Sequence, residues 1–154
     1  MEDDQVLNWC RDRLGTEIHV GEWLTITQER INRFATATDD FQWIHVDVAR
    51  AEKESPWKTT IAHGFLTLSL YPTMRMPAAG AIAWPGVRTV INYGLNRVRF
   101  MNAVRVGSQL RLRSTLKSVE SVAGAVQIEE ECTFEIGGQS KPACVADVVL
   151  RLYR

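Results

Sequence analysis

The sequence predicts an α+β fold in which an antiparallel β-sheet wraps around a central apolar α-helix. Three observations support this prediction. The first half of the chain has the pattern of helices and irregular segments, the second half has the pattern of strands, and one helical segment between them is apolar on nearly every side. The chain has 154 residues, a length that favours a single domain over residues 1–154.

Short elements are predicted ahead of the apolar helix. They cover residues 6–14, 23–26, 27–38 and 46–54. Thr27 is a preferred N-cap residue, and the apolar positions after it share one face of a helix. This helix should end where Asp39 and Asp40 begin a polar turn, and Pro56 should end the last short helix.

Residues 63–74 form the most apolar helix candidate in the chain. Apolar side chains point in almost all directions from this segment, so we expect a single helix that is buried on most sides. Pro72 lies within it and cannot donate a backbone hydrogen bond, so a kink or an end is expected nearby. A loop is predicted over residues 77–86.

Four strands are predicted in the second half of the chain, over residues 89–100, 110–117, 126–136 and 143–153. Apolar and polar residues alternate in the middle two strands, which indicates one buried face and one solvated face. Gly137 and Gly138 form a turn before the last strand. Residues 129–131 are three consecutive glutamates, which we interpret as solvated charge.

Composition excludes several classes of protein. Eighteen Lys and Arg residues balance eighteen Asp and Glu residues, so the formal net charge is zero and no nucleic-acid partner is expected. The chain begins with acidic residues, and its longest apolar stretch is far shorter than the roughly 20 residues of a membrane helix, so no membrane association is expected. No phosphate-cradling glycine motif and no nucleophile elbow occur, which argues against nucleotide cofactors and esterase-type catalysis.

The three cysteines cannot all pair within one chain, and their spacing does not resemble a metal site. We therefore expect free thiols, a reducing compartment and a cytoplasmic location.

Asp40 and His45 are the first candidates for chemistry. They are five residues apart in a loop after a helix, and a turn can direct both side chains into one cleft. A carboxylate and an imidazole that share a water molecule form an acid–base pair, because histidine changes charge near neutral pH. The apolar neighbours Phe41, Trp43 and Ile44 would partly desolvate this pair. The alternative is a helix-capping aspartate and a histidine that only packs.

His63 and Gly64 open the apolar helix. The first N–H groups of a helix have no partner within the helix, and glycine lets a substrate carbonyl oxygen approach them, as in an oxyanion hole. The alternative is that Gly64 only relieves crowding while His63 caps or packs. Further along, Arg97 and Arg99 share one face of a strand and suit phosphates or carboxylates, although a solvated strand face explains them equally well.

Together, and in this order, these three stretches resemble the MaoC-like dehydratase family, within its hydratase 2 group of (R)-specific enoyl-CoA hydratases. The string Gln-Trp-Ile-His-Val-Asp at residues 42–47 is typical of the branch similar to nodulation protein N. The resemblance implies a hot-dog fold, a homodimer with a continuous sheet, and hydration or dehydration of a trans-2-enoyl thioester without a metal or redox cofactor. The family's catalytic aspartate and histidine fall on Asp40 and His45, and the glycine whose N–H binds the thioester oxygen falls on Gly64.

The chain departs from the broader family at Asp39, Gln42 and Trp43, where glycine, asparagine and proline are usual. A glycine at such a position often has a positive φ, which aspartate tolerates better than most residues do. A second carboxylate at Asp39 would raise a neighbouring pKa if it faced the cleft, but we expect it to point to solvent. Coenzyme A is expected only as part of an acyl-CoA substrate. The substrate-binding residues that we predict are Gln42, Trp43, His63, Phe65, Arg97 and Arg99.

The favoured function is therefore a lyase of the enoyl-CoA hydratase or 3-hydroxyacyl-CoA dehydratase type, acting in fatty-acid metabolism. The first alternative is a hot-dog acyl-CoA thioesterase, an enzyme class that generally lacks this Asp-x4-His string followed by Ala-His-Gly. The second is a non-catalytic subunit that binds acyl thioesters, which would not need Asp40, His45 and Gly64 together.

Overall fold

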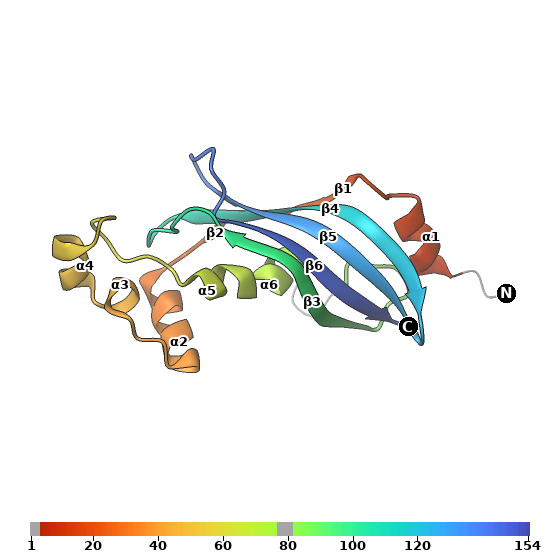
Figure 1. Cartoon of the computed structure of the whole chain (residues 1–154), viewed down its shortest axis with the longest axis horizontal. Coiled ribbons are helices and arrows are strands. Elements are labelled where there is room, and N and C mark those ends of the chain that lie inside the picture. The colour runs from red at the N-terminus through yellow and green to blue at the C-terminus, as the bar shows by residue number, and fades with distance from the viewer. Residues whose placement is uncertain (1–3, 77–81) are drawn as a thin grey trace.

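The protein folds as one curved antiparallel sheet that covers two short helices, which confirms the predicted α+β architecture. The computed structural model describes residues 4–76 and 82–154. The strand order is β1-β4-β5-β6-β3, with β2 also paired to β4. Figure 1 shows the long strands curving over α5 and α6, while α2, α3 and α4 form a separate lobe at one end of the sheet.

The four predicted strands are all present. They are β3 (Thr89–Phe100), β4 (Gln109–Val122), β5 (Ala125–Ile136) and β6 (Cys144–Tyr153). β4 extends beyond the predicted end at residue 117. The sequence pattern did not reveal this extension, because the register shifts between Leu116 and Ser118 and the alternation of buried residues is lost beyond that shift. The short strands β1 (Glu17–Val20) and β2 (Leu24–Thr25) pair with β4. β1 was not predicted, because none of its four residues is buried and they carry no clear alternation.

The helices are α1 (Gln5–Arg11), α2 (Gln28–Thr38), α3 (Trp43–Val46), α4 (Val48–Glu54), α5 (Gly64–Ser69) and α6 (Tyr71–Arg75). Thr27 caps α2 as predicted, since its hydroxyl accepts a hydrogen bond from the Arg30 N–H at 3.2 Å. The predicted helix over residues 46–54 is in fact α4 preceded by the separate turn of α3, and Asp47 caps α4 by accepting from the Arg50 N–H.

The prediction of one continuous helix over residues 63–74 was wrong, because α5 ends at Ser69 and α6 starts at Tyr71. The break falls where Pro72 has no N–H to continue the helical hydrogen bonds, so the expected end near this proline is confirmed. Burial is also less complete than predicted. Leu66, Leu70 and Tyr71 are buried, but the Phe65 side chain is 68% exposed on the opposite side.

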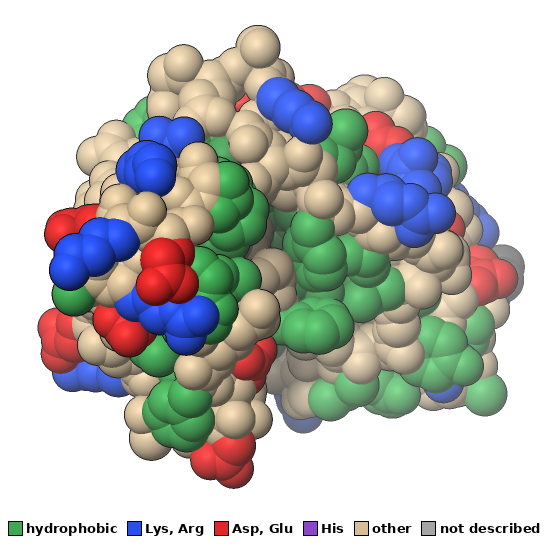
Figure 2. All heavy atoms as spheres, turned by 60° about the vertical axis from the view of Figure 1, so that its left-hand side comes forward, with side chains coloured by type: hydrophobic (Ala, Val, Ile, Leu, Met, Phe, Trp, Pro, Cys, Tyr) green, Lys and Arg blue, Asp and Glu red, His purple; other side chains and the backbone are tan. Residues whose placement is uncertain are grey.

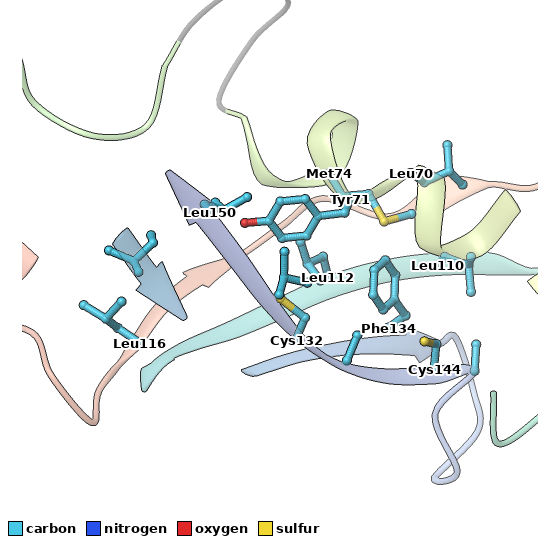
Figure 3. Packing of buried hydrophobic residues seen from close by; sticks show 14 of the residues in the cluster. Leu70, Tyr71, Met74, Leu110, Leu112, Leu116, Cys132, Phe134, Cys144 and Leu150 are labelled. Atoms are coloured by element: carbon cyan, nitrogen blue, oxygen red, sulfur yellow. The ribbon is translucent and has the colours of Figure 1, made fainter. Parts of the chain in front are cut away.

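The core lies between the concave face of the sheet and the helices α1, α5 and α6. Figure 3 shows Leu70, Tyr71 and Met74 of the helical segment next to the inward side chains of β4 and β5, such as Leu112 and Phe134. The alternation predicted for β5 is confirmed, since every second residue of that strand is buried.

The interpretation of Glu130 as solvated charge was wrong, because its side chain is 0% exposed. Glu130 lies on the inward face of β5, where two residues of α6 donate hydrogen bonds to its carboxylate. Arg75 donates to it through Nε at 3.0 Å and Nη2 at 2.9 Å, and the Tyr71 hydroxyl donates at 2.9 Å. The Arg75 guanidinium also lies 4.4 Å from the centre of the Trp84 ring.

Cys10, Cys132 and Cys144 are free and buried, as expected for unpaired thiols. Among the residues that the structure describes, no helix combines the length and the apolar character needed to cross a bilayer. Of the loop predicted over residues 77–86, residues 77–81 lie outside the described residues, and residues 82–86 form neither helix nor strand.

Candidate active site

Asp40, His45 and His63 come together where the α2–α4 lobe meets the start of α5. One nitrogen or oxygen atom of each side chain lies within 4.8 Å of those of the other two. The sequence had predicted that Asp40 and His45 converge, and the structure adds the ring of His63 to the same place. Their catalytic and binding roles remain predictions, while their proximity is a structural fact.

The position of Asp40 depends on the residue before it. Asp39 ends α2 in the left-handed conformation, with φ 57° and ψ 23°, which aspartate tolerates better than most residues do. The chain therefore reverses sharply, and Asp40 lies next to the start of α5. Its Oδ1 accepts a hydrogen bond from the Gln42 N–H at 3.3 Å, and its Oδ2 lies 4.0 Å from His63 Nε2. The Asp40 side chain is 52% exposed, so its oxygen atoms keep free capacity to accept hydrogen bonds.

His45 lies in α3 instead of the predicted loop, and its ring is buried. Its Nδ1 lies 2.7 Å from the carbonyl oxygen of Ile61. A carbonyl can only accept, so Nδ1 carries the proton and the neutral ring has its lone pair on Nε2. Burial lowers the pKa of His45, partly opposed by the Ile61 hydrogen bond, while His63 lowers it further and Asp40 raises it. His45 is thus a neutral base with one nitrogen oriented and the other available.

Gln28 fixes the main chain of His45 through hydrogen bonds, a role that the sequence analysis missed. Its side-chain amide donates to the carbonyl oxygen of His45 at 2.8 Å and accepts from the Thr60 hydroxyl at 2.5 Å. The Ile61 N–H donates to the Ile44 carbonyl at 3.0 Å. These bonds join α2, α3 and the segment before α5. A single glutamine after an N-cap gives no sequence signal for such a role.

His63 occupies the N-cap position of α5 and is 3% exposed. Its Nε2 lies 3.0 Å from the main-chain oxygen of Asp40. Its ring is stacked on the ring of His45, with centroids 3.9 Å apart and planes inclined by 25°, and is tilted against Phe34 at 4.9 Å.

The hydrogen bonds of the two imidazole rings bear on whether these side chains could share a metal ion. Only an unprotonated ring nitrogen can bind a metal, and His45 Nδ1 and His63 Nε2 each lie against a main-chain oxygen that can only accept. The three side chains are close enough for a metal site, and the absence of a metal cofactor remains a prediction.

Gly64 is the first residue of α5, so its N–H has no acceptor within that helix. A Cβ atom at this position would lie 3.1 Å from ring carbons of Phe100, a tight contact that favours glycine unless the ring shifts slightly. The crowding alternative therefore holds alongside the oxyanion prediction. α5 has six residues, so the individual N–H group is a more important donor than the helix dipole.

Three other predicted substrate residues, Gln42, Trp43 and Phe65, are close to this group in the sequence. Gln42 is exposed, Trp43 is half-buried under the Arg50 guanidinium at 4.3 Å, and Phe65 makes an edge-to-face contact with Phe100 at 5.8 Å. Figure 2 brings this end of the molecule forward and shows a hollow with hydrophobic side chains on both sides. No histidine is visible on that surface, in keeping with the burial of His45 and His63.

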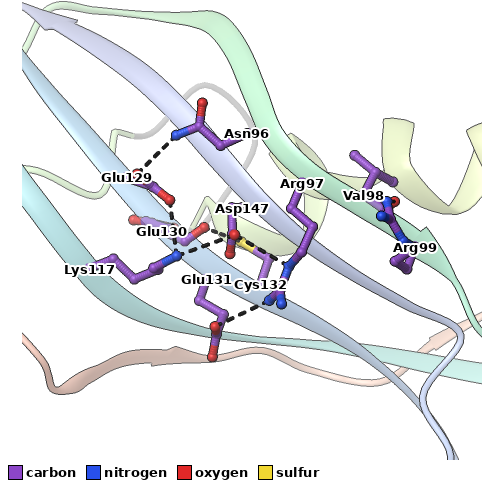
Figure 4. Close-up of polar contacts among 10 residues, drawn as sticks. All are labelled: Asn96, Arg97, Val98, Arg99, Lys117, Glu129, Glu130, Glu131, Cys132 and Asp147. Atoms are coloured by element: carbon purple, nitrogen blue, oxygen red, sulfur yellow. Dashed lines mark hydrogen bonds and ion pairs between the residues drawn. The ribbon is translucent and has the colours of Figure 1, made fainter.

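Arg97 and Arg99 belong to a different region. They pair opposite Asp147 and Val145 of β6, two residues apart, so the prediction that they share one face is confirmed. Arg97 forms ion pairs with Asp147 at 3.3 Å and Glu131 at 3.4 Å, as Figure 4 shows. The Arg99 guanidinium donates to the Val98 carbonyl at 2.7 Å. The structure does not place either arginine with the Asp40 group, and a phosphate would compete with carboxylates for Arg97.

Comparison with known proteins gives consistent results. The family model described as MaoC like domain matches residues 11–134. The chain is 48% identical over 138 residues to the 3-hydroxyacyl-thioester dehydratase Z of Mycobacterium tuberculosis, covering 89% of both chains. It is 42% identical over 136 residues to Nodulation protein N of Rhizobium leguminosarum bv. viciae, covering 88% of this chain and 83% of that protein.

Two solved structures share the fold. The unliganded R-hydratase PhaJ1 from Pseudomonas aeruginosa superposes with a TM-score of 0.68 at 20% identity, over 92% of this chain and 82% of the other. The ChsH1-ChsH2 complex from Mycobacterium tuberculosis contains a chain with a TM-score of 0.65 at 16% identity, over 90% of this chain and 97% of the other.

Proposed function

The chain belongs to the family of MaoC-like domains, and on that premise we propose that it is a lyase that hydrates trans-2-enoyl thioesters or dehydrates 3-hydroxyacyl thioesters. One observation carries this proposal. His45 is oriented by the Ile61 carbonyl so that its Nε2 is unprotonated, and the Asp40 carboxylate lies in the same group of side chains. A base and a second proton acceptor at that separation can hold one water molecule between them.

The chemistry follows from these groups. The thioester carbonyl withdraws electrons from the double bond and makes the β-carbon electrophilic. The water held by Asp40 and His45 adds its oxygen to the β-carbon and gives one proton to the pair. The same pair delivers a proton to the α-carbon, so that water has been added and the enzyme is unchanged. Dehydration is the reverse sequence, in which the pair removes the α-proton and protonates the leaving hydroxyl.

Gly64 stabilises the negative charge that forms on the thioester oxygen during the addition of water. As the water attacks, negative charge develops on the thioester oxygen, and the free N–H of Gly64 donates a hydrogen bond to it. We propose that Gln42, Trp43 and Phe65 contact the acyl part of the substrate, and that Arg97 and Arg99 contact the phosphates of coenzyme A. We propose no metal and no redox cofactor, since each proton transfer is supplied by Asp40 and His45.

The exposed edge of the sheet supports a homodimer. β3 is an edge strand, and its side chains Ile91, Tyr93 and Leu95 are between 45% and 56% exposed. An unpaired edge that carries large apolar side chains is a surface that proteins normally cover. We propose that β3 pairs with β3 of a second copy to form one continuous sheet. A Tyr93→Arg variant should then sediment as a monomer, and a wild-type chain that is monomeric at micromolar concentration would contradict the proposal.

The activity is tested with a short trans-2-enoyl-CoA. Loss of the conjugated enoyl absorbance without release of free thiol is the expected result. Thiol release would identify a thioesterase. Binding without either change, over a series of acyl lengths, would identify a non-catalytic acyl-thioester subunit. We further propose a cytoplasmic location, where the three buried thiols stay reduced.

A further inference from the structure

We infer that His63 is a positioning residue that fixes both the main chain of Asp40 and the ring plane of His45, instead of the substrate-binding residue that the sequence suggested. This inference rests on the proposed function, because it assigns a task within the same reaction. It is based on three contacts of one buried side chain, which join segments that are far apart in the sequence.

The first contact holds Asp40. His63 Nε2 lies 3.0 Å from the Asp40 carbonyl oxygen, which can only accept, so Nε2 carries a proton and donates it. Asp40 lies in the turn created by the left-handed Asp39, and its own side chain is half exposed. The bond from His63 ties this turn to the start of α5, 23 residues further along the chain. The bond therefore fixes the main-chain position from which the Asp40 side chain extends.

The second and third contacts hold His45. The hydrogen bond to Ile61 fixes one atom of the His45 ring but leaves the ring free to tilt about that bond. Stacking on His63 at 3.9 Å removes this freedom, and Phe34 supports His63 in turn at 4.9 Å. Since His63 is 3% exposed, its atoms serve contacts inside the protein more readily than contacts with a substrate.

The His63 nitrogen that remains supports the same conclusion. The other ring nitrogen, Nδ1, is buried without a hydrogen-bond partner among the described residues. Since the side chain is 3% exposed, neither nitrogen is readily reached by a substrate that arrives from solvent. The ring lies between Asp40, His45 and Phe34.

The consequence for catalysis is geometric. The attacking water must contact Asp40 and His45 at once, and misplacement by about 1 Å costs roughly 10²-fold in rate. Two substitutions separate the contributions of His63. His63→Phe keeps an aromatic ring but has no donor, whereas His63→Gln keeps an N–H donor at a similar reach but has no ring.

We expect His63→Phe to lower kcat by about 10- to 100-fold with KM within about twofold, because the substrate contacts stay intact while the water is misplaced. His63→Gln should recover kcat to within about tenfold of the wild-type value, because the bond to Asp40 is restored. If both variants instead raise KM and leave kcat unchanged, His63 binds substrate and the inference is overturned.

His19 provides a matched control, because its Nε2 makes the same kind of contact with a main-chain oxygen, that of Met74 at 2.6 Å near the end of α6. His19→Gln should leave kcat and KM unchanged, and equal losses in the His19 and His63 variants would overturn the inference by showing a general stability effect.

A second readout does not depend on activity. Nitrogen-15 spectra of the imidazole side chains should show a proton on Nε2 of His63. An unprotonated Nε2 would overturn the inference, even if the wild-type protein had no hydratase activity and the proposed function had failed on its own test.

Discussion

Two carboxylates of this protein, Asp40 and Glu130, lie beside rings and nitrogen donors, yet they have opposite surroundings. Glu130 is fully buried, and both of its oxygen atoms accept from Arg75 or Tyr71. Asp40 is half exposed and accepts one long hydrogen bond from a main-chain N–H. A carboxylate whose lone pairs are all occupied stabilises the fold, whereas one with free lone pairs can bind water. The contacts of a carboxylate, more than its burial, therefore indicate which role it has.

The strongest test of the comparison removes the two groups that are proposed to hold the water. We expect Asp40→Asn and His45→Gln each to lower kcat/KM by about 10³-fold or more, since each removes a proton acceptor of the acid–base pair. The melting temperature should change little. Asp39→Asn is the matched control, because asparagine tolerates the left-handed conformation of Asp39 and should keep activity. Near-full activity of either Asp40→Asn or His45→Gln would contradict the assignment.

Glu130 should show the opposite behaviour, a loss of stability. Glu130→Gln removes the charge that balances the buried Arg75 guanidinium, so the free energy of unfolding should fall by about 3–5 kcal/mol in urea titrations. Glu131→Gln is the control from the next position. Its ion pair with Arg97 is about half exposed, so its loss should cost about 1 kcal/mol or less. Equal losses in the two variants would show that the buried contacts of Glu130 with Arg75 and Tyr71 do not give it a special role in stability.

Gly64 tests how closely the oxyanion donor is packed. In Gly64→Ala the new methyl group would approach the ring of Phe100 to about 3.1 Å, and this ring is partly exposed and able to shift. We therefore expect kcat to fall by roughly tenfold, while the free energy of unfolding falls by only about 1 kcal/mol. A large loss of stability with unchanged kcat would mean that Gly64 serves packing alone.

The smallest expected effect is a pH dependence. Burial, the largest cause, holds the pKa of His45 below its ordinary value of 6.5. The neutral ring is the base, so the acidic limb of kcat/KM should have its midpoint below pH 6.5, with a tenfold loss per unit beyond it. A midpoint at or above 6.5 would contradict this environment. Around Glu130 no such change is expected from Tyr71, because burial and the nearby carboxylate raise its pKa well above 10.

The same His45 shift makes a contribution to stability whose sign can be stated. The unfolded chain binds a proton to His45 near pH 6.5, whereas the folded chain binds it only at lower pH. This contribution is therefore complete above pH 6.5 and is lost as the pH falls from 6.5 through the folded-state pKa. Because His19 is shifted in the same direction, His45→Gln must be compared with the wild type to isolate the His45 part.

Much of the fold followed from local patterns. Thr27 and Asp39 lie at the two caps of α2, and their residue types are suited to the backbone conformations found there. The alternation of apolar and polar residues in β5 determines which face of that strand is buried. The meeting of Asp40 and His45 was also predictable, because they are only five residues apart where the chain bends after α2. Such features depend on residues that are close together in the sequence, so they can be predicted from one sequence alone.

Other features depend on distant partners and left no local signal. The buried state of Glu130 requires Arg75, 55 residues earlier, to reach the inner face of the sheet. Gln28 holds the carbonyl of His45 across 17 residues, and polar residues in its position are usually solvated. The break at Leu70 depended on where Pro72 stops the helix, which the sequence placed only approximately.

The way in which His45 is held has a consequence for engineering this protein. Ile61 and Gln28 secure the histidine from the interior, while Gln42 and Trp43, its neighbours in the sequence, make no hydrogen bond to its ring in the described part of the chain. Under the proposed function, Gln42 and Trp43 would contact the acyl group while Ile61 and Gln28 orient the ring and main chain of the base. A library of variants at positions 42 and 43 could be screened for new acyl preferences while the base keeps its orientation.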